Sequence, residues 1–138
     1  MPAKDIYHNC VKNALIKDDW IITHDPLSLK WGKKDMYVDL GAEQLLAAEK
    51  AKFKIAVEIK SFTGLSEMAD LEKAIGQYIL YNDVLAQVEP DRKLYLAISE
   101  EVANGLFAEP LGELLLKNNR FCLVVFEPNK ETIIKWIP

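Results

Sequence analysis

The chain has 138 residues, half of them hydrophobic, so we expect residues 1–138 to form a single domain with a buried core. Its longest apolar runs are too short to cross a bilayer, and its first residues lack the apolar segment of a secretion signal, so we expect a cytoplasmic protein without membrane contact. The formal net charge of −4 excludes a protein that binds nucleic acid through overall positive charge, and the two cysteines and two histidines lack the spacing of zinc ligands.

The first half of the chain predicts a helix followed by three strands. Apolar residues recur at helical spacing over residues 3–17, and residues 20–23 read as a short strand that ends at a His-Asp-Pro turn. Residues 35–41 alternate as a second strand, with Tyr37 and Asp39 on its polar side. Residues 42–53 could form a helical turn or the far end of a long hairpin, and we expect the hairpin.

The second half predicts a long helix, a buried strand, a second helical stretch and two closing strands. Ser66 is a plausible N-cap for a helix that runs to about residue 86. Its expected core stripe consists of Met68, Leu71, Ile75, Tyr78, Ile79 and Leu85. Strand 93–99, a helical stretch over 100–118 broken at Pro110, and two strands follow. The order α-β-β-β-α-β-α-β-β predicts an α/β sandwich around a central mixed sheet.

The third strand, IAVEIKSF at residues 55–62, carries two charges in an apolar run. Glu58 and Lys60 stand on one side of it, ~7 Å apart along the strand. If the second strand pairs with it, Asp39 and Glu58 converge, and a divalent cation relieves the repulsion between two close carboxylates. Asp39, Glu58 and the Ile59 carbonyl would suit Mg²⁺ or Mn²⁺, and Lys60 could orient a water and stabilise charge on a phosphate. A solvated strand face with a weak ion pair is the alternative.

Four further features have both a structural and a functional interpretation. Gln77 and Tyr81 lie one turn apart on the long helix, either as an ordinary flank or beside a site. His8 reads as an exposed histidine of the first helix, and whether it joins the site is left open. Glu43 is an alternative metal ligand because the hairpin register is unknown. A basic band is a solvated hairpin or a phosphate-binding face, and it comprises Lys30, Lys33, Lys34, Lys50, Lys52, Lys54 and Lys60.

The arrangement of Asp39 and Glu58-x-Lys60 on successive strands resembles the PD-(D/E)XK nuclease superfamily. The predicted order α-β-β-β-α-β also matches that superfamily's core over residues 3–99, so the resemblance implies a restriction-endonuclease-like fold, although Val38 stands where the motif has proline. A Gln-x-x-x-Tyr pair resembles the RecB-like branch. The resemblance implies a metal-dependent endonuclease with Asp39, Glu58, Lys60, Gln77 and Tyr81 in its site.

A longer resemblance is to the XisH family, cyanobacterial proteins named as fdxN element excision controlling factors. It rests on the segments KDIYHNCVKNAL, VDLGAE, KIAVEIKSF, GQYILY and EPDRKLYLAIS. The resemblance implies a part in excising a DNA element during heterocyst development, together with a site-specific recombinase and an XisI-type protein. Two functions follow as hypotheses: a Mg²⁺-dependent endonuclease-like protein, or a catalytically silent regulatory subunit for the recombinase or the XisI-type partner. DNA contact, with help from a partner, and a homodimer are left open.

Overall fold

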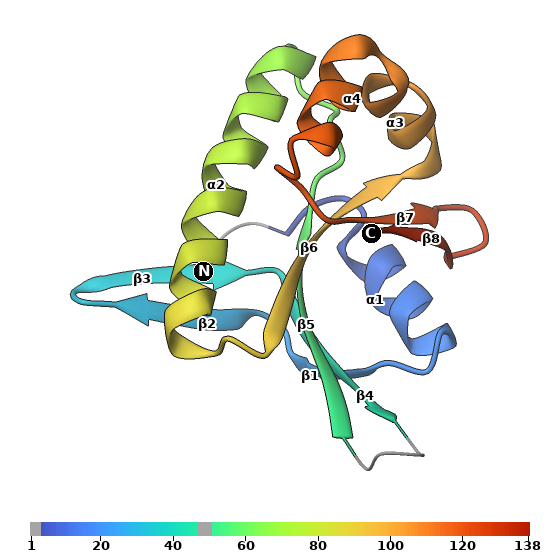
Figure 1. Cartoon of the computed structure of the whole chain (residues 1–138). Helices are drawn as coiled ribbons and strands as arrows, with labels where there is room; N and C mark the ends of the chain where they lie inside the picture. Colours follow the sequence, from blue (N-terminus) through green and yellow to red (C-terminus); the bar gives the residue numbers. More distant parts are fainter. Residues whose placement is uncertain (1–3, 47–50) are drawn as a thin grey trace.

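The computed structural model describes residues 4–46 and 51–138, which form an α/β sandwich around a six-stranded mixed sheet (Figure 1). The elements follow one another as α1 (His8–Lys17), β1 (Ile21–His24), β2 (Leu27–Trp31), β3 (Lys34–Val38), β4 (Leu40–Leu46), β5 (Ala51–Ile59), α2 (Glu67–Val88), β6 (Arg92–Ser99), α3 (Glu100–Asn104), η1 (Leu106–Ala108), α4 (Pro110–Lys117), β7 (Leu123–Glu127) and β8 (Thr132–Ile137). None of the helices in the described ranges is long and apolar enough to span a membrane.

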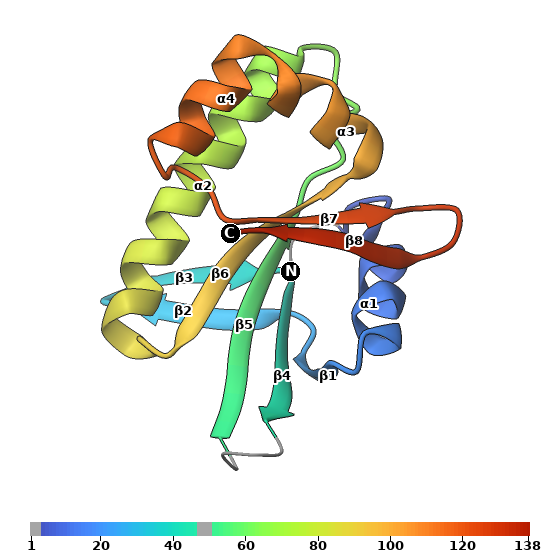
Figure 2. The same ribbon diagram turned by 45° about the vertical axis from the view of Figure 1, so that its right-hand side comes forward.

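The central sheet has the order β1-β4-β5-β6-β7-β8. Its middle strands β5, β6 and β7 run parallel, whereas β1–β4, β4–β5 and β7–β8 are antiparallel pairs. Helix α1 packs on one face, and α2 with the α3–η1–α4 region packs on the other (Figure 2). The predicted α/β sandwich with a mixed central sheet is therefore confirmed, and each face of the sheet has its own apolar cluster.

The predicted strand at 35–41 divides at Asp39 into two strands that belong to different sheets. Residues up to Val38 form β3, which pairs with β2 in a separate two-stranded sheet, and β4 begins at Leu40 and pairs with β5. Strand β2 was absent from the sequence-based order, in which its residues led into the second strand as a connection. Consequently Val38 packs under α2 while Leu40 packs under α1, whereas the predicted continuous strand would have put both side chains on the same side.

The expected hairpin over residues 42–53 is present where the structure describes it, with β4 and β5 in register from Leu40–Val57 to Leu46–Ala51. The part of that expectation at residues 47–50 lies outside the described residues. The first helix begins at His8, later than residue 3, of which the structure gives no description.

Helix α2 is capped as expected, because the Ser66 hydroxyl accepts a hydrogen bond from the Ala69 N–H at 3.1 Å. Its buried face differs from the predicted stripe: Met68 and Ile79 are exposed. The residues that α2 buries are Leu71, Ala74, Tyr78, Tyr81, Val84 and Leu85. The reason is tertiary, since the curved sheet and the β2–β3 hairpin contact a face of α2 rotated from the one with the largest side chains.

Candidate active site

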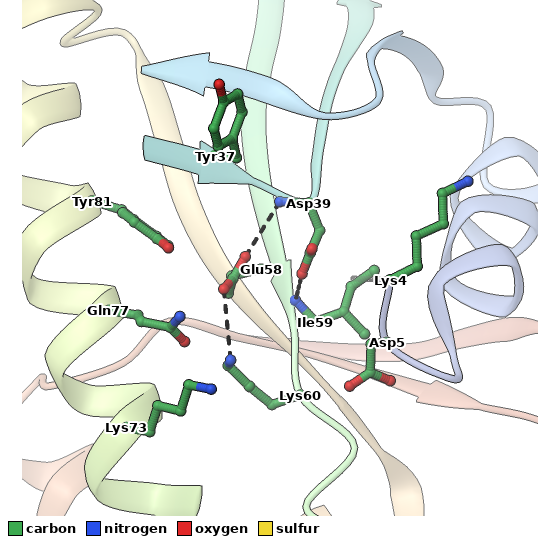
Figure 3. A pocket seen from close by; sticks show the side chains of 10 residues that line it. All are labelled: Lys4, Asp5, Tyr37, Asp39, Glu58, Ile59, Lys60, Lys73, Gln77 and Tyr81. Carbon is green, nitrogen blue, oxygen red and sulfur yellow. Dashed lines mark hydrogen bonds and ion pairs between the residues drawn. The ribbon is translucent and has the colours of Figure 1, made fainter. Parts of the chain in front are cut away.

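A cavity of about 280 Å³ opens between the end of β5, the β3–β4 junction and one face of α2 (Figure 3). The structure brings all the predicted site residues to this cavity, although they come from three separate elements. Its lining consists of Lys4, Asp5, Tyr37, Asp39, Glu58, Ile59, Lys60, Lys73, Gln77 and Tyr81.

Asp39 and Glu58 are held against each other by reciprocal bonds to the backbone. The Asp39 N–H donates to Glu58 Oε1 at 3.2 Å, and the Ile59 N–H donates to Asp39 Oδ2 at 2.7 Å. Leu40 and Val57 are the last paired residues of β4 and β5. If the same register is continued by one position, Asp39 lies opposite Glu58. The break between β3 and β4 therefore positions the carboxylate of Asp39. Asp39 lies outside the backbone pairing of β4 with β5, and its side chain accepts a hydrogen bond from β5 instead.

Glu58 is buried, with 5% of its surface exposed, on a sheet face that the sequence interpretation had treated as polar. Ala56, on the same side of β5, belongs to the apolar cluster under α2, so that face is apolar except at the cavity. Burial raises the pKa of Glu58 to about 9, and the charge of Asp39 and a hydrogen bond with Asp39 add to this effect. The nearby Lys60 lowers the pKa, but its effect is smaller than that of burial. Without a bound cation, Glu58 therefore carries a proton at neutral pH.

Lys60 Nζ lies 3.8 Å from Glu58 Oε2 and points into the same cavity (Figure 3). Glu58 and Lys60 thus share a side of the strand, as the alternation predicted, and Lys60 is only half-buried. The ammonium group is close enough to act on a ligand held by the two carboxylates.

The oxygen atoms that face the cavity suit a hard cation such as Mg²⁺. The Ile59 side chain packs on the opposite face of the sheet, so Ile59 contributes its backbone to the cavity. Its N–H points to Asp39, and the C=O of a strand residue points to the same side as its N–H. Two carboxylates, one of them desolvated, and this carbonyl match the oxygen ligands Mg²⁺ prefers. Within the described ranges no group of three or more His, Cys, Asp and Glu side chains is placed to hold a metal ion.

Gln77 and Tyr81 reach the cavity from α2 (Figure 3). Gln77 Oε1 is buried and has no hydrogen-bond partner among the described residues. Tyr81 is 8% exposed, and burial together with the charges of Glu58 and Asp39 raises its pKa to about 12, so its hydroxyl stays protonated and can donate. Tyr81 was expected beside the apolar stripe, and it is in fact part of the core cluster.

Sequence reasoning missed three charged residues that line the cavity: Lys4, Asp5 and Lys73. Lys73 could have been found, because it precedes Gln77 by four residues on the helix face that carries Tyr81. Asp5 has a structural task as well: its Oδ2 accepts a hydrogen bond from the Ser61 N–H at 3.1 Å, which ties the N-terminal segment to the end of β5. Nothing in the local pattern around Lys4 and Asp5 indicates this long-range contact.

The two additional candidates of the sequence interpretation lie outside the cavity. Glu43 pairs with Arg92 at 3.7 Å and with Lys52 at 3.3 Å, at the opposite part of β4. His8 is not exposed as expected, since only 4% of it is accessible and its Nε2 lies 2.7 Å from Asp25 Oδ1. The turn that follows β1 covers this histidine, which a reading of the helix alone could not show.

Fold and cavity together describe a small α/β sandwich protein with a carboxylate–lysine pocket at the end of a central strand. The family profile described as XisH protein matches residues 1–134, and the chain belongs to the XisH family. None of the curated proteins compared with the chain matches it.

Two crystal structures agree with this membership. An XisH family protein from Nostoc punctiforme PCC 73102 is 33% identical, with a TM-score of 0.87, over 97% of this chain and 100% of that one. An fdxN element excision controlling factor protein from Anabaena variabilis is 35% identical, also with a TM-score of 0.87, over 98% of this chain and 100% of that one.

Proposed function

We propose that this protein takes part in controlling the excision of a DNA element, and that its cavity is a Mg²⁺-dependent endonuclease-like site of the PD-(D/E)XK type. The first part is supported by membership of the XisH family and by the name of the Anabaena variabilis relative, an fdxN element excision controlling factor. The second part rests on one observation: Asp39, Glu58 and Lys60 meet in one cavity with Gln77 and Tyr81 opposite them.

The chemistry of the site is hydrolysis of a phosphodiester. A bound Mg²⁺, or Mn²⁺ in its place, would supply Lewis acidity and neutralise charge on the phosphate. Asp39, Glu58 and the Ile59 carbonyl would hold that ion. Lys60 orients the attacking water and stabilises the negative charge that develops on the phosphate oxygens.

The residues of α2 position substrate and water from the other side of the cavity. The unpartnered Gln77 Oε1 is an acceptor for a water proton, and the protonated Tyr81 hydroxyl donates to a phosphate oxygen. Both groups lie on a helix that is packed along the sheet, so their positions relative to β5 are fixed by the core.

A catalytically silent regulatory subunit is the second candidate function. It is favoured by the net charge of −4, which opposes unaided binding to DNA, and by the raised pKa of Glu58, which leaves the ligand set incompletely ionised at neutral pH. In that role the protein would bind a site-specific recombinase or an XisI-type protein.

The test is nicking of supercoiled plasmid by the purified protein with Mn²⁺, compared with Lys60→Ala. We expect Lys60→Ala to abolish nicking without lowering the melting temperature appreciably. The matched control is Lys52→Ala, which removes a lysine of β5 whose side chain is 59% exposed and outside the cavity. Undiminished nicking by Lys60→Ala would overturn the mechanism.

Metal binding can be followed separately from cleavage. A cation that binds only the folded protein raises its melting temperature, by an amount worth about 2.7 kcal/mol at a concentration 100 times its dissociation constant. Mn²⁺ should stabilise the wild-type protein and not Asp39→Asn. Metal binding without cleavage of any DNA form, combined with a stable complex with an XisI-type protein, would favour the regulatory subunit.

A further inference from the structure

The β2–β3 hairpin projects from the body of the protein as a separate two-stranded ribbon (Figure 1). Its base is anchored, because Leu27, Leu29 and Val38 belong to the core cluster under α2. Its tip extends beyond that cluster: every residue from 30 to 35 is exposed. Because the base is fixed and the tip is exposed, the residues at the tip are accessible to a partner molecule.

The tip reads KWGKKD, which combines three lysines with an aromatic residue. Trp31 is 53% exposed although it is paired across the ribbon with Lys34. Gly32 adopts a φ of +61° in the turn, which allows the tight reversal next to Lys33. A large indole in water next to clustered positive charge is the composition of nucleic-acid-binding surfaces.

The lysines at the tip differ from the other lysines of the basic band. Among residues 4–46 and 51–138, no carboxylate oxygen lies within 4 Å of the ammonium groups of Lys30, Lys33 or Lys34, whereas Lys52, Lys54 and Lys60 all have acidic partners. The structure therefore separates the described lysines of the band into those with an acidic neighbour, Lys52, Lys54 and Lys60, and those at the ribbon tip, whereas Lys50 lies outside the described residues. The tip lysines have charge available for an external anion in addition to Lys60 in the cavity.

The ribbon tip lies at a defined distance from the cavity. Tyr37 of β3 lines the cavity (Figure 3). Lys34 is three residues away on the same strand. At ~3.3 Å per residue the two are ~10 Å apart, which equals about three base-pair steps of duplex DNA. Because Tyr37 belongs both to the ribbon and to the lining of the cavity, a duplex with one phosphate in the cavity can reach the ribbon.

We propose that the β2–β3 hairpin is a DNA-gripping arm that enters the major groove of the duplex whose phosphodiester lies in the cavity. The inference rests on the proposed function, since it names the contact through which that site takes up its substrate. The major groove admits a two-stranded β-ribbon. Lys30, Lys33 and Lys34 contact phosphates on its rims, and Trp31 packs against base edges. Lysine contacts to phosphate carry no sequence information, so the arm supplies affinity and orientation.

The experiment measures binding of fluorescein-labelled duplex DNA by anisotropy in EDTA, where no cleavage occurs. The variants are Lys30→Gln/Lys33→Gln/Lys34→Gln combined, and Trp31→Ala with Trp31→Phe. Each lost phosphate contact should weaken binding about 8-fold at 100 mM salt, and three contacts should lower the slope of log K against log salt by about 2.7. Trp31→Ala should weaken binding roughly tenfold or more, and Trp31→Phe should recover part of it.

The matched control is the combined Lys117→Gln/Lys130→Gln/Lys135→Gln variant. It makes the same change in net charge at exposed lysines that do not line the cavity, and it should keep the wild-type affinity and slope. Equal losses in the two triple variants would overturn the arm, because a general charge effect would then explain the data. Tighter binding of single strands than of duplex would also overturn it.

These experiments can refute the DNA-binding arm and the endonuclease-like site separately. If the ribbon variants bind like the wild type while Lys60→Ala no longer nicks, the arm is refuted and the proposed function stands. If the wild type binds duplex through the ribbon but nothing is nicked with Mn²⁺, the arm stands and the endonuclease-like site is refuted. A wild type that binds no duplex even at 50 mM salt refutes the arm.

Discussion

Replacing Glu58 by Gln should make the metal-free protein more stable at neutral and alkaline pH. The carboxyl group is 5% exposed and faces Asp39, so ionising it in the folded protein is unfavourable. A glutamine preserves the contacts with Asp39, because its carbonyl can accept from the Asp39 N–H while its amide donates to the Asp39 carboxylate. The substitution removes the charge and keeps the shape.

The expected size follows from the pKa of Glu58, which folding raises from 4.5 to about 9. A group whose pKa is raised in the folded state binds more protons there, so its contribution to stability is complete below pH 4.5 and declines as pH rises toward 9. At ~1.4 kcal/mol per pH unit, the loss in wild type is about 3 kcal/mol at pH 7. The Gln variant should therefore gain about that amount over wild type at pH 7, or roughly 10 °C in melting temperature.

Urea unfolding at several pH values between 4 and 9, in EDTA, measures the difference between the two proteins. The difference should be near zero at pH 4 and grow with pH. A difference that is independent of pH would refute the raised pKa, and a Gln variant less stable than wild type at pH 8 would refute the buried, charge-opposed carboxyl. A matched control is Glu113→Gln, which makes the same change of side chain on the exposed surface of α4.

Three further substitutions test how the fold is held together. Tyr78→Phe removes the buried hydroxyl that donates to a β6 carbonyl at 2.9 Å and accepts from a backbone amide before β7 at 3.0 Å, so urea unfolding should show a loss of about 2–4 kcal/mol. Arg92→Met should lower the free energy of unfolding by about 2–4 kcal/mol in the same measurement, because the Arg92 side chain is 2% exposed and its guanidinium lies between acceptors. The control Arg120→Met, at an exposed position, should leave the stability nearly unchanged. Gly112→Ala should lower stability by about 1–3 kcal/mol in thermal melts, since the new Cβ would lie 2.5 Å from Phe107 Cα; a gain, as helix propensity alone predicts, would contradict this close packing.

Local patterns in the sequence determined those parts of the site that depend on one element. The period of two along β5 put Glu58 and Lys60 on one side, and the period of 3.6 along α2 put Gln77 and Tyr81 on one face. The Ser66 cap and the apolar runs of β6 and β7 likewise predicted elements that the structure contains. These features follow from short-range geometry, which is the same in every fold.

The tertiary structure alone decided what meets across elements. Asp39 contacts Glu58 because the chain leaves one sheet and enters another at that residue, a choice of strand partner that alternation cannot reveal. The same choice makes residues 27–38 a projecting ribbon, whose lysines have no acidic partner within 4 Å among residues 4–46 and 51–138. Lys73 joins the cavity because α2 crosses the end of β5, and the pKa of Glu58 is raised because tertiary packing buries its carboxyl group beside Asp39. Burial and register come from long-range packing. The sequence therefore predicted residues of the site but could not predict their charge state.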